Sequence, residues 1–486
     1  MQKIADLRYS SAVLQWDQET YMPVKGAAMR GRQLATLAEL AHEQFTSPQM
    51  GSMLRSLKER RTLSAAEMRN VELSLQDYDK NCKLPASYVR RLSEATNLAF
   101  HAWIDARRKN TFSIFQQSLQ HLIDLKKQEA EYLGYVHHPY DALLDEFDKG
   151  QTVAKLDNIF NSLRPRITEI LEAVASRPQV EDGFLRGNFN KDAQWALGIE
   201  VLGLMGYDFE AGRQDISEHP FTTNFSSQDV RVTTRIDEKD FSNMLWSCIH
   251  EGGHALYEQG LPAGEYGLPL GEYCSLSIHE SQSRLWENCI GRSNSFWEKY
   301  VYLLEKYFPE QFKNISTREF YKAINKVSPS FIRTEADELT YHFHVIIRYE
   351  LEKMLIGGSL EPRDIPAAWN ELYLKYLGII VPDDRRGCLQ DVHWSHGSFG
   401  YFSTYSIGSL YAAQFYAAIY GNSGSIIMPS NDLDIGKAAG WLTQHIYPHG
   451  RYYNSEELCA LATGEKLNPD YFVSYATRKY KEIYGI

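Results

Sequence analysis

The sequence has few cysteines, no long apolar run and no excess of basic residues. Its 486 residues include six cysteines, and no two of them show the two-residue spacing of a zinc knuckle or redox pair. A chain of this length needs no disulfide framework, so we expect reduced thiols. Residues 1–20 carry charges throughout, unlike a signal peptide, and no uncharged apolar run could span a bilayer. These absences predict a soluble, cytoplasmic protein without a membrane partner.

The net charge is −11, from 51 Lys and Arg against 62 Asp and Glu. Nucleic acids and anionic membranes are bound by basic surfaces, so neither is expected as the main partner. With 43% hydrophobic and 23% charged residues, the composition is that of an ordinary globular protein. Small molecules and peptides remain the open classes of ligand.

Hydrophobic periodicity predicts helices along most of the chain. Within 115–133, apolar residues recur at three- and four-residue steps, for example at Phe115, Leu119 and Leu122, which gives a helix one apolar face. The exception is 219–236, where Val230 and Val232 alternate with polar residues as in a strand. No linker rich in Pro, Gly or Ser interrupts the chain. We therefore predict one mainly α domain over 1–486 with a small few-stranded β-sheet, and loops near 260–271, 382–387 and 421–434.

Residues 250–254 read HEGGH, which is the H-E-x-x-H pattern. His250 and His254 are four residues apart and lie on one face of a helix, so both imidazoles can bind one metal ion. Glu251 would lie beside the metal as the base for a bound water, and not as a ligand. Two adjacent glycines weaken a helix by roughly 1 kcal/mol each relative to alanine, so metal ligation or close packing must compensate. The alternative is a chance match on a buried helix, and a third ligand decides between them.

A third histidine at the metzincin spacing is absent, because Gln259 and Gly260 occupy those positions. The next carboxylate in a strong context is Glu280, 26 residues after His254 (280 − 254), and a loop and a second helix can return it to the metal. Two histidines and one glutamate are typical of a catalytic zinc site with one position left for water. His279 is the alternative ligand, or it hydrogen-bonds a ligand from outside the metal shell. We predict one zinc ion per chain, with cobalt as an alternative ion.

Several motifs in one order resemble the Taq carboxypeptidase family of zinc metallocarboxypeptidases. They are LQWD at 14–17, HPF at 219–221, DVRVT at 229–233, HEGGH at 250–254, HESQSRLWEN at 279–288, IRTEAD at 332–337 and GCLQDVHW at 387–394. The likeness covers nearly the whole chain. It implies an elongated, all-helical fold with a deep active-site groove, shared with neurolysin-like and angiotensin-converting-enzyme-like peptidases.

The resemblance also implies a homodimer that releases single residues from peptides with a free C-terminus, with broad specificity. Within one metallocarboxypeptidase domain, we expect residues 1–210 to form a helical groove wall. Residues 211–410 would form the catalytic core and 411–486 the C-terminal helices.

Residues that stabilise the substrate oxyanion are suggested by the same resemblance. Glu251 would take the proton of the water and pass it to the leaving amine. His393 and Tyr405 are the expected oxyanion donors, because a histidine followed some twelve residues later by a tyrosine is similar to the arrangement in the related groove peptidases. Tyr401 is the alternative donor. Core packing is the competing role for each tyrosine, since the chain contains 31 of them.

An exopeptidase must bind the terminal carboxylate of its substrate, for which the planar guanidinium of arginine is the best match. Arg333 is the first candidate and Arg231 the second, both from motif positions. The alternative for Arg333 is an ion pair with Asp337, four residues further along a helix. Asp337 and Asp391 are also candidates to accept hydrogen bonds from ligand imidazoles. Resemblance alone suggests that Gln390 donates to the substrate backbone.

Two other functions are compatible with these residues. An endo-oligopeptidase would share the metal chemistry but would not need an arginine for the terminal carboxylate. A non-catalytic peptide-binding scaffold would carry the motif as a relic, and the intact His250, Glu251, His254 and Glu280 weigh against it. We therefore predict a zinc-dependent metallocarboxypeptidase.

Overall fold

The computed structural model describes residues 1–421 and 433–486, which are mainly helical with one small sheet. The prediction of a mainly α fold with a few short strands is thus confirmed. The loops predicted at 260–271 and 382–387 contain only turns and short 3-10 segments beyond Gly260. Most of the loop predicted at 421–434 lies outside the described residues. Among the helices of the described ranges, none is long and apolar enough to cross a membrane.

The chain forms two compact units, each built from three separate segments. Unit 1 comprises Met1–Asn81, Val180–Ile324 and Gly408–Tyr471, and unit 2 comprises Cys82–Gln179, Asn325–Ile407 and Phe472–Ile486. The division of a single domain into residues 1–210, 211–410 and 411–486 stays a prediction.

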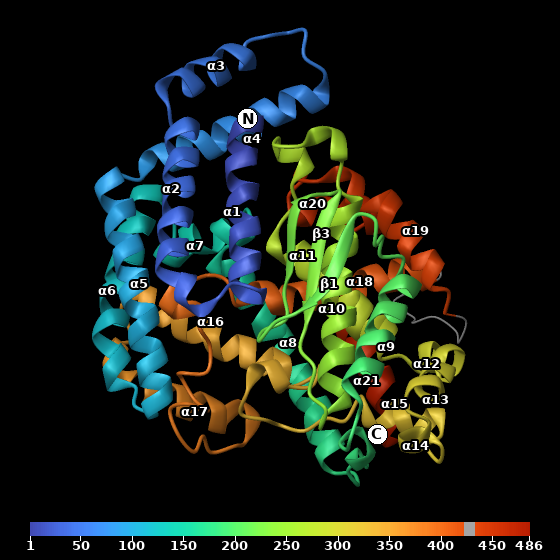
Figure 1. The fold of residues 1–486 in the computed structure, drawn as a ribbon. Coiled ribbons are helices and arrows are strands. Elements are labelled where there is room, and N and C mark those ends of the chain that lie inside the picture. The colour runs from blue at the N-terminus through green and yellow to red at the C-terminus, as the bar shows by residue number, and fades with distance from the viewer. Residues whose placement is uncertain (422–432) are drawn as a thin grey trace. The chain divides into compact units, whose positions relative to one another are not determined.

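Unit 1 holds the sheet and most of the short helices. Its longer elements are α1 (Gln2–Thr20), α2 (Ala27–Phe45), α3 (Pro48–Lys58), most of α4 (Ala65–Lys83), α9 (Lys191–Met205), α10 (Phe241–Gly260), α11 (Leu276–Arg284), most of α18 (Ser403–Tyr420), α19 (Ile435–His445) and α20 (Ser455–Thr463). Four short helices follow one another between them: α12 (Asn294–Tyr300), α13 (Tyr302–Tyr307), α14 (Pro309–Phe312) and α15 (Thr317–Ala323). Helices α1 and α2 run side by side, as Figure 1 shows in blue.

The sheet has the strand order β1-β3-β2, with β1 (Gly212–Ile216) parallel and β2 (Thr222–Ser226) antiparallel to β3 (Asp229–Thr234). Val230 and Val232 of β3 are buried, as their alternation predicts. They form a hydrophobic cluster with Leu202 of α9 and Ala255 of α10. The sheet therefore packs against α10, the helix that carries the HEGGH residues (Figure 1).

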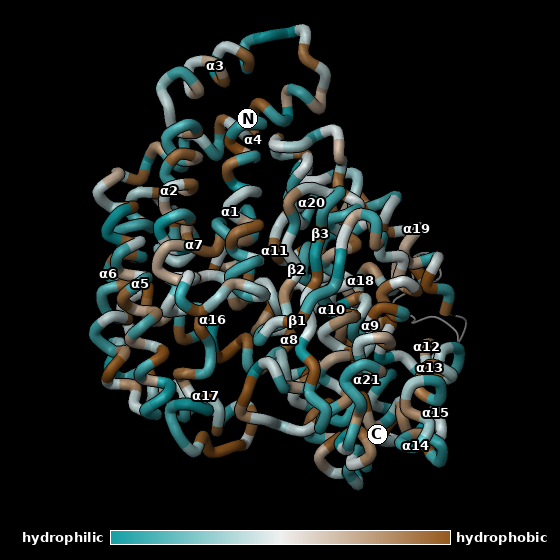
Figure 2. Tube along the Cα trace, viewed as in Figure 1, coloured by the Kyte–Doolittle hydropathy of each residue, from teal (hydrophilic) through white to brown (hydrophobic). Residues whose placement is uncertain are grey.

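The main helices of unit 2 are α5 (Ala86–Lys109), α6 (Ser113–Leu133), α7 (Pro139–Phe147), α8 (Val153–Ala175), α16 (Tyr341–Gly357), α17 (Ile365–Leu377) and most of α21 (Asp470–Tyr484). Figure 2 shows hydrophobic and hydrophilic segments alternating along α5 and α6, as amphipathic helices require. The predicted apolar face of α6 is buried at Phe115, Leu119 and Leu122. The indole of Trp103 in α5 donates to the backbone oxygen of Leu389 at 3.0 Å, which fixes the start of the GCLQDVHW segment.

Candidate metal centre and its surroundings

Helix α10 presents both histidines of the HEGGH motif. It begins at Phe241, after the side chain of Asp240 caps it by accepting a hydrogen bond from the backbone N–H of Ser242 at 2.9 Å. Close packing accounts for one of its two glycines. A Cβ atom at Gly253 would lie 2.7 Å from the backbone oxygen of Gln282, so only glycine lets α11 approach α10 this closely. The helix that carries Glu280 thus rests directly on the HEGGH turn.

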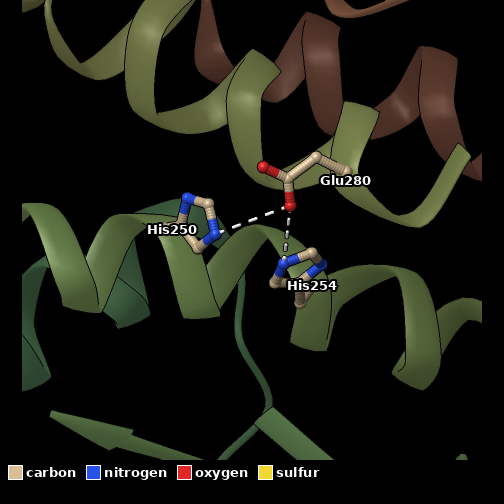
Figure 3. A group of neighbouring side chains, drawn as sticks. All are labelled: His250, His254 and Glu280. Atoms are coloured by element: carbon tan, nitrogen blue, oxygen red, sulfur yellow. Dashed lines mark ion pairs between the residues drawn. The ribbon is translucent and has the colours of Figure 1, made fainter. Parts of the chain in front are cut away.

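His250, His254 and Glu280 form one cluster, in which one donor atom from each residue lies within 4.8 Å of the others. The Nε2 atom of His250 is 3.7 Å from Oε2 of Glu280, and Nε2 of His254 is 3.4 Å from the same oxygen. Figure 3 shows the carboxylate of Glu280 pointing from α11 toward the two imidazoles of α10. Two imidazole nitrogens and one carboxylate oxygen are the donor set of a catalytic zinc site. The residues present therefore fit a zinc ion.

Two side chains of α11 donate hydrogen bonds to the carboxylate of Glu280. Its Oε1 atom accepts from Nε of Arg284 at 2.6 Å, and its Oε2 accepts from Oγ of Ser283 at 3.1 Å. Burial raises the pKa of Glu280, but Arg284 and the imidazole of His250 outweigh it and hold the pKa well below its usual range. The Cβ and Cγ atoms of Glu280 also lie 2.6 Å from where a Cβ at Gly408 of α18 would stand. The carboxylate of Glu280 is therefore ionised, and its side chain lies between α10 and α18.

The Nδ1 atom of His250 has a carboxylate partner that the sequence reasoning missed. It lies 2.9 Å from Oε2 of Glu287, which belongs to the π-helical turn Leu285–Gly291 after α11. Glu287 also accepts from Arg292 at 2.9 Å and pairs with Arg284 at 3.4 Å. Burial raises the pKa of Glu287, but its bond to His250 and the two arginines lower it well below the usual range. A carboxylate on the far nitrogen fixes the orientation of a ligand imidazole.

The Nδ1 atom of His254 contacts a second histidine. It lies 2.6 Å from Nδ1 of His279, and Nε2 of His279 lies 2.8 Å from Oε1 of Glu258. His279 thus hydrogen-bonds a candidate ligand, as one of the two roles predicted for it requires. Burial lowers the pKa of His254 to about 3, which keeps the imidazole of this candidate ligand neutral.

Glu251 is 8% exposed and points to the sheet. Its Oε2 atom accepts from the hydroxyl of Thr222 in β2 at 2.6 Å. Burial raises the pKa of Glu251, and His250 and the Thr222 hydroxyl oppose that rise. A base with a raised pKa is suited to proton transfer near neutral pH. Thr222 directly follows the HPF motif at 219–221, and that adjacency is the signal that could have found it.

Unit 2 brings together the predicted oxyanion donors. Nε2 of His393 lies 3.1 Å from the hydroxyl of Tyr405, and the ring of Tyr401 lies 5.2 Å from that of His393 and 5.3 Å from that of Tyr405. Burial and then Arg333 lower the pKa of His393 to about 3, so its imidazole is neutral. The three side chains lie at the end of the GCLQDVHW segment and the start of α18.

A buried glutamate anchors this segment, and no sequence pattern indicated it. Glu352 of α16 is fully buried and accepts from the indole of Trp394 at 2.7 Å and from the backbone N–H of Gly400 at 2.8 Å. The hydroxyl of Tyr140 in α7 donates to it as well. Burial raises the pKa of Glu352 to about 7 in spite of these donors. Glu352 therefore fixes both ends of the turn between His393 and Tyr401.

Arg333 is only 5% exposed and pairs with Asp391, at 3.0 Å through Nε and 2.9 Å through Nη2. The alternative pairing with Asp337 is wrong. A single 3-10 turn, Arg333–Glu335, is followed by extended backbone at Ala336, so the helical four-residue spacing does not apply. Asp337 instead accepts from the hydroxyl and backbone N–H of Thr340 at the start of α16.

Asp391 also pairs with Arg348, at 2.6 Å. The expectation that Asp337 or Asp391 accepts from a ligand imidazole is wrong, because Glu287 and His279 contact the Nδ1 atoms of the two candidate ligands, His250 and His254. With two guanidiniums on one carboxylate, the triad of Arg333, Arg348 and Asp391 carries a net charge of +1.

Gln390 and Arg231 lie in well-defined surroundings. The side-chain oxygen of Gln390 accepts from the backbone N–H of Arg333 at 2.8 Å, and its amide donates to the backbone oxygen of Phe331 at 2.9 Å. In unit 1, Arg231 of β3 forms two 2.9 Å bonds with Asp229 and stacks over the ring of Trp16, 4.4 Å from its centroid. Trp16 belongs to the LQWD motif, so this motif and DVRVT meet at the sheet.

A cavity of about 620 Å³ in unit 1 lies elsewhere. Its walls include Met205 at the end of α9, Gln259 at the end of α10, and Tyr447, and none of the three candidate metal ligands lines it. The chemistry that the side chains support is therefore at the His250 cluster and not in this cavity.

Comparison with known proteins gives one family. The sequence model of the Carboxypeptidase Taq (M32) metallopeptidase family matches residues 1–480. Carboxypeptidase 1 of Bacillus subtilis is 39% identical over 486 residues, covering 100% of this chain and 97% of that protein. Thermostable carboxypeptidase 1 of Pyrococcus furiosus is 35% identical, with 98% and 96% covered. The crystal structure of an M32 carboxypeptidase from Deinococcus radiodurans has a TM-score of 0.95 at 40% identity, with 100% and 98% covered.

Proposed function

Since the chain belongs to the Carboxypeptidase Taq (M32) family of metallopeptidases and is a metallocarboxypeptidase, we propose that its working metal is one zinc ion. His250, His254 and Glu280 would hold the ion. The observation that carries this proposal is that both Nε2 atoms face the same oxygen of Glu280 at 3.4–3.7 Å. A bound zinc ion would lower the pKa of a water ligand toward neutrality and polarise the scissile carbonyl.

Glu251 is the proposed base. It receives a proton from the attacking water and returns it to the nitrogen of the departing residue. Thr222 supports this role because its hydroxyl fixes one carboxylate oxygen of Glu251 and leaves the other for the water. The raised pKa of Glu251, caused by its burial, lets it both accept and release the proton.

Substrate recognition is proposed for unit 2. Arg333 would bind the terminal carboxylate, and the net positive charge of the Arg333, Arg348 and Asp391 triad supports an anionic ligand. His393 and Tyr405 would donate to the substrate oxyanion, with Tyr401 as the alternative donor. Gln390 would donate a hydrogen bond to the substrate backbone. In unit 1, Arg231 is the second candidate to bind the terminal carboxylate of the substrate.

The remaining proposals follow from the family resemblance. They are an active-site groove of the neurolysin and angiotensin-converting-enzyme type, a homodimer, a cytoplasmic location, broad specificity, and cobalt as a substitute ion. The alternative activity is that of an endo-oligopeptidase.

Mass spectrometry of an unblocked peptide incubated with wild type and Glu251→Gln tests the mechanism. A ladder of one-residue steps from the C-terminus is expected, and it should stop when zinc is removed and be absent in the variant. Internal fragments would instead favour the endo-oligopeptidase. Arg333→Ala should lower kcat/KM far more for a free C-terminus than for the amidated peptide, and equal losses would remove Arg333 from carboxylate recognition.

A further inference from the structure

A relay of side chains leads from His254 away from the metal cluster to the sheet. Nδ1 of His254 contacts Nδ1 of His279, whose Nε2 contacts Glu258, and Glu258 accepts from the side-chain amide of Asn224 at 2.6 Å. Glu258 lies one helical turn after His254 on α10, and Asn224 lies on β2. The relay thus joins three elements that meet beneath the metal cluster: α10, α11 and the sheet.

The two ends of this relay, Glu258 and Nε2 of His254, determine which atom donates in each hydrogen bond. The carboxylate of Glu258 can only accept, so Nε2 of His279 carries a proton and donates it. Nε2 of His254 can bind a metal only when the proton of His254 is on Nδ1, so Nδ1 of His279 is the acceptor and the proton of His279 is on Nε2. Nδ1 of His254 must therefore be the donor across the 2.6 Å contact. This leaves the lone pair of His254 on Nε2, the atom that faces Glu280.

The two histidine ligands are oriented by different means. His250 donates directly to a carboxylate, that of Glu287, at 2.9 Å. His254 reaches its carboxylate only through the interposed imidazole of His279. That imidazole is confined by the rings of Tyr257 and Tyr273, whose centroids lie 5.5 and 4.9 Å away. Its orientation is thus fixed by packing as well as by hydrogen bonds.

We propose that His279 and Glu258 are positioning residues, which hold His254 in the tautomer protonated on Nδ1 and so keep Nε2 available to the metal. This inference rests on the proposed zinc site. Partners of ligand imidazoles typically contribute 10- to 100-fold to metal affinity. Without His279 as acceptor, Nδ1–H of His254 would lose its hydrogen bond, which favours the tautomer protonated on Nε2, and Nε2 could then not bind zinc.

Zinc titration of the metal-free protein against a fluorescent chelator tests this proposal. His279→Phe keeps a ring between the two tyrosines but removes the acceptor, and it should weaken the zinc Kd by about 10- to 100-fold. His279→Asn retains an oxygen near the position of Nδ1 and should bind zinc within about threefold of wild type, while Glu258→Gln should fall between the two. His445→Phe is the matched control, because it removes an imidazole stacked on Trp441 in α19 and should leave the Kd unchanged.

The tautomer is read directly from ¹⁵N NMR of histidine-labelled, metal-free protein, with the His254 signal identified by its loss in His254→Phe. Wild type and His279→Asn should show His254 protonated on Nδ1, and His279→Phe should show it protonated on Nε2. Wild-type His254 protonated on Nε2, or His279→Phe binding zinc as tightly as wild type, would overturn the relay. If wild type and His254→Phe bind zinc equally, the proposed metal site itself fails, which is a different outcome.

Discussion

Replacing Gly408 by alanine should displace Glu280, the proposed carboxylate ligand, while leaving all three proposed ligand residues unsubstituted. The new Cβ would stand 2.6 Å from Cβ and Cγ of Glu280. Carbon atoms in contact lie about 3.5–4.0 Å apart, so Glu280 or α18 would have to move by about 1 Å. Glu280 cannot simply retreat, because Arg284 holds its carboxylate and α11 already lies against Gly253 on its other side.

The size of the effect follows from the cost of overpacking a buried site, about 1–3 kcal/mol. At about 1.4 kcal/mol per tenfold, zinc binding should weaken roughly 5- to 140-fold if the whole cost falls on the position of Glu280. Chelator competition measures the Kd, and thermal unfolding measures stability. The matched control is Gly440→Ala in α19, where a Cβ meets nothing within 4 Å. It should leave zinc affinity unchanged and stabilise the helix by up to about 1 kcal/mol.

A Gly408→Ala variant with wild-type zinc affinity and a Tm no lower than that of wild type would contradict this reasoning. A fall in Tm with unchanged affinity would place the strain in α18 and leave Glu280 where it is.

Three further predictions concern other side chains. Thr222→Val removes the hydroxyl that opposes the raised pKa of Glu251, so the acid limb of the pH profile of kcat/KM should move to higher pH. Thr222→Ser should return the acid limb to its wild-type position. An acid limb that does not move in Thr222→Val would show that this contact does not affect the pKa of the base. Tyr405→Phe keeps the ring and should lower kcat about 100-fold with little change in KM, and a change confined to KM would contradict an oxyanion role. The pKa of Glu352 is about 7 in the folded protein against an ordinary 4.5, so between pH 4.5 and 7 the folded state binds a proton that the unfolded state does not. The contribution of Glu352 to the free energy of unfolding should therefore fall by about 3 kcal/mol as the pH rises from 4.5 to 7. Urea unfolding at pH 5 and 7.5 should show this slope in wild type, and an equal slope in Glu352→Gln would assign it to another group.

The elements that the sequence predicted well are those set by local periodicity. A four-residue spacing places His250 and His254 on one side of α10 whatever surrounds that helix, and the alternation of Val230 and Val232 marks β3 in the same way. The placement of Glu280 required more, because a loop of unknown path lies between it and His254. It was predictable because few residue types complete such a ligand set.

The partners of those residues were harder to predict because they depend on how elements pack. Thr222 reaches Glu251 only because β2 lies against α10, and Gly408 approaches Glu280 from more than a hundred residues away in the sequence. For Arg333, a local rule gave a wrong prediction. A local helical rule paired it with Asp337, but the backbone leaves the helical conformation at Ala336, and Asp391 takes that place.

Glu287 depends on packing for its contact with His250, but its spacing from Glu280 and Arg284 is a local signal. Glu280, Arg284 and Glu287 recur at steps of four and three residues, the spacing of one helical face. In the structure Arg284 bonds to Glu280 at 2.6 Å and pairs with Glu287 at 3.4 Å, so one guanidinium connects the carboxylate ligand to the carboxylate that orients His250. The pairing persists although Glu287 lies in the π-helical turn that begins at Leu285. The HESQSRLWEN segment therefore supplies a proposed ligand, its counter-ion and the partner of a second proposed ligand from nine consecutive positions, 279–287.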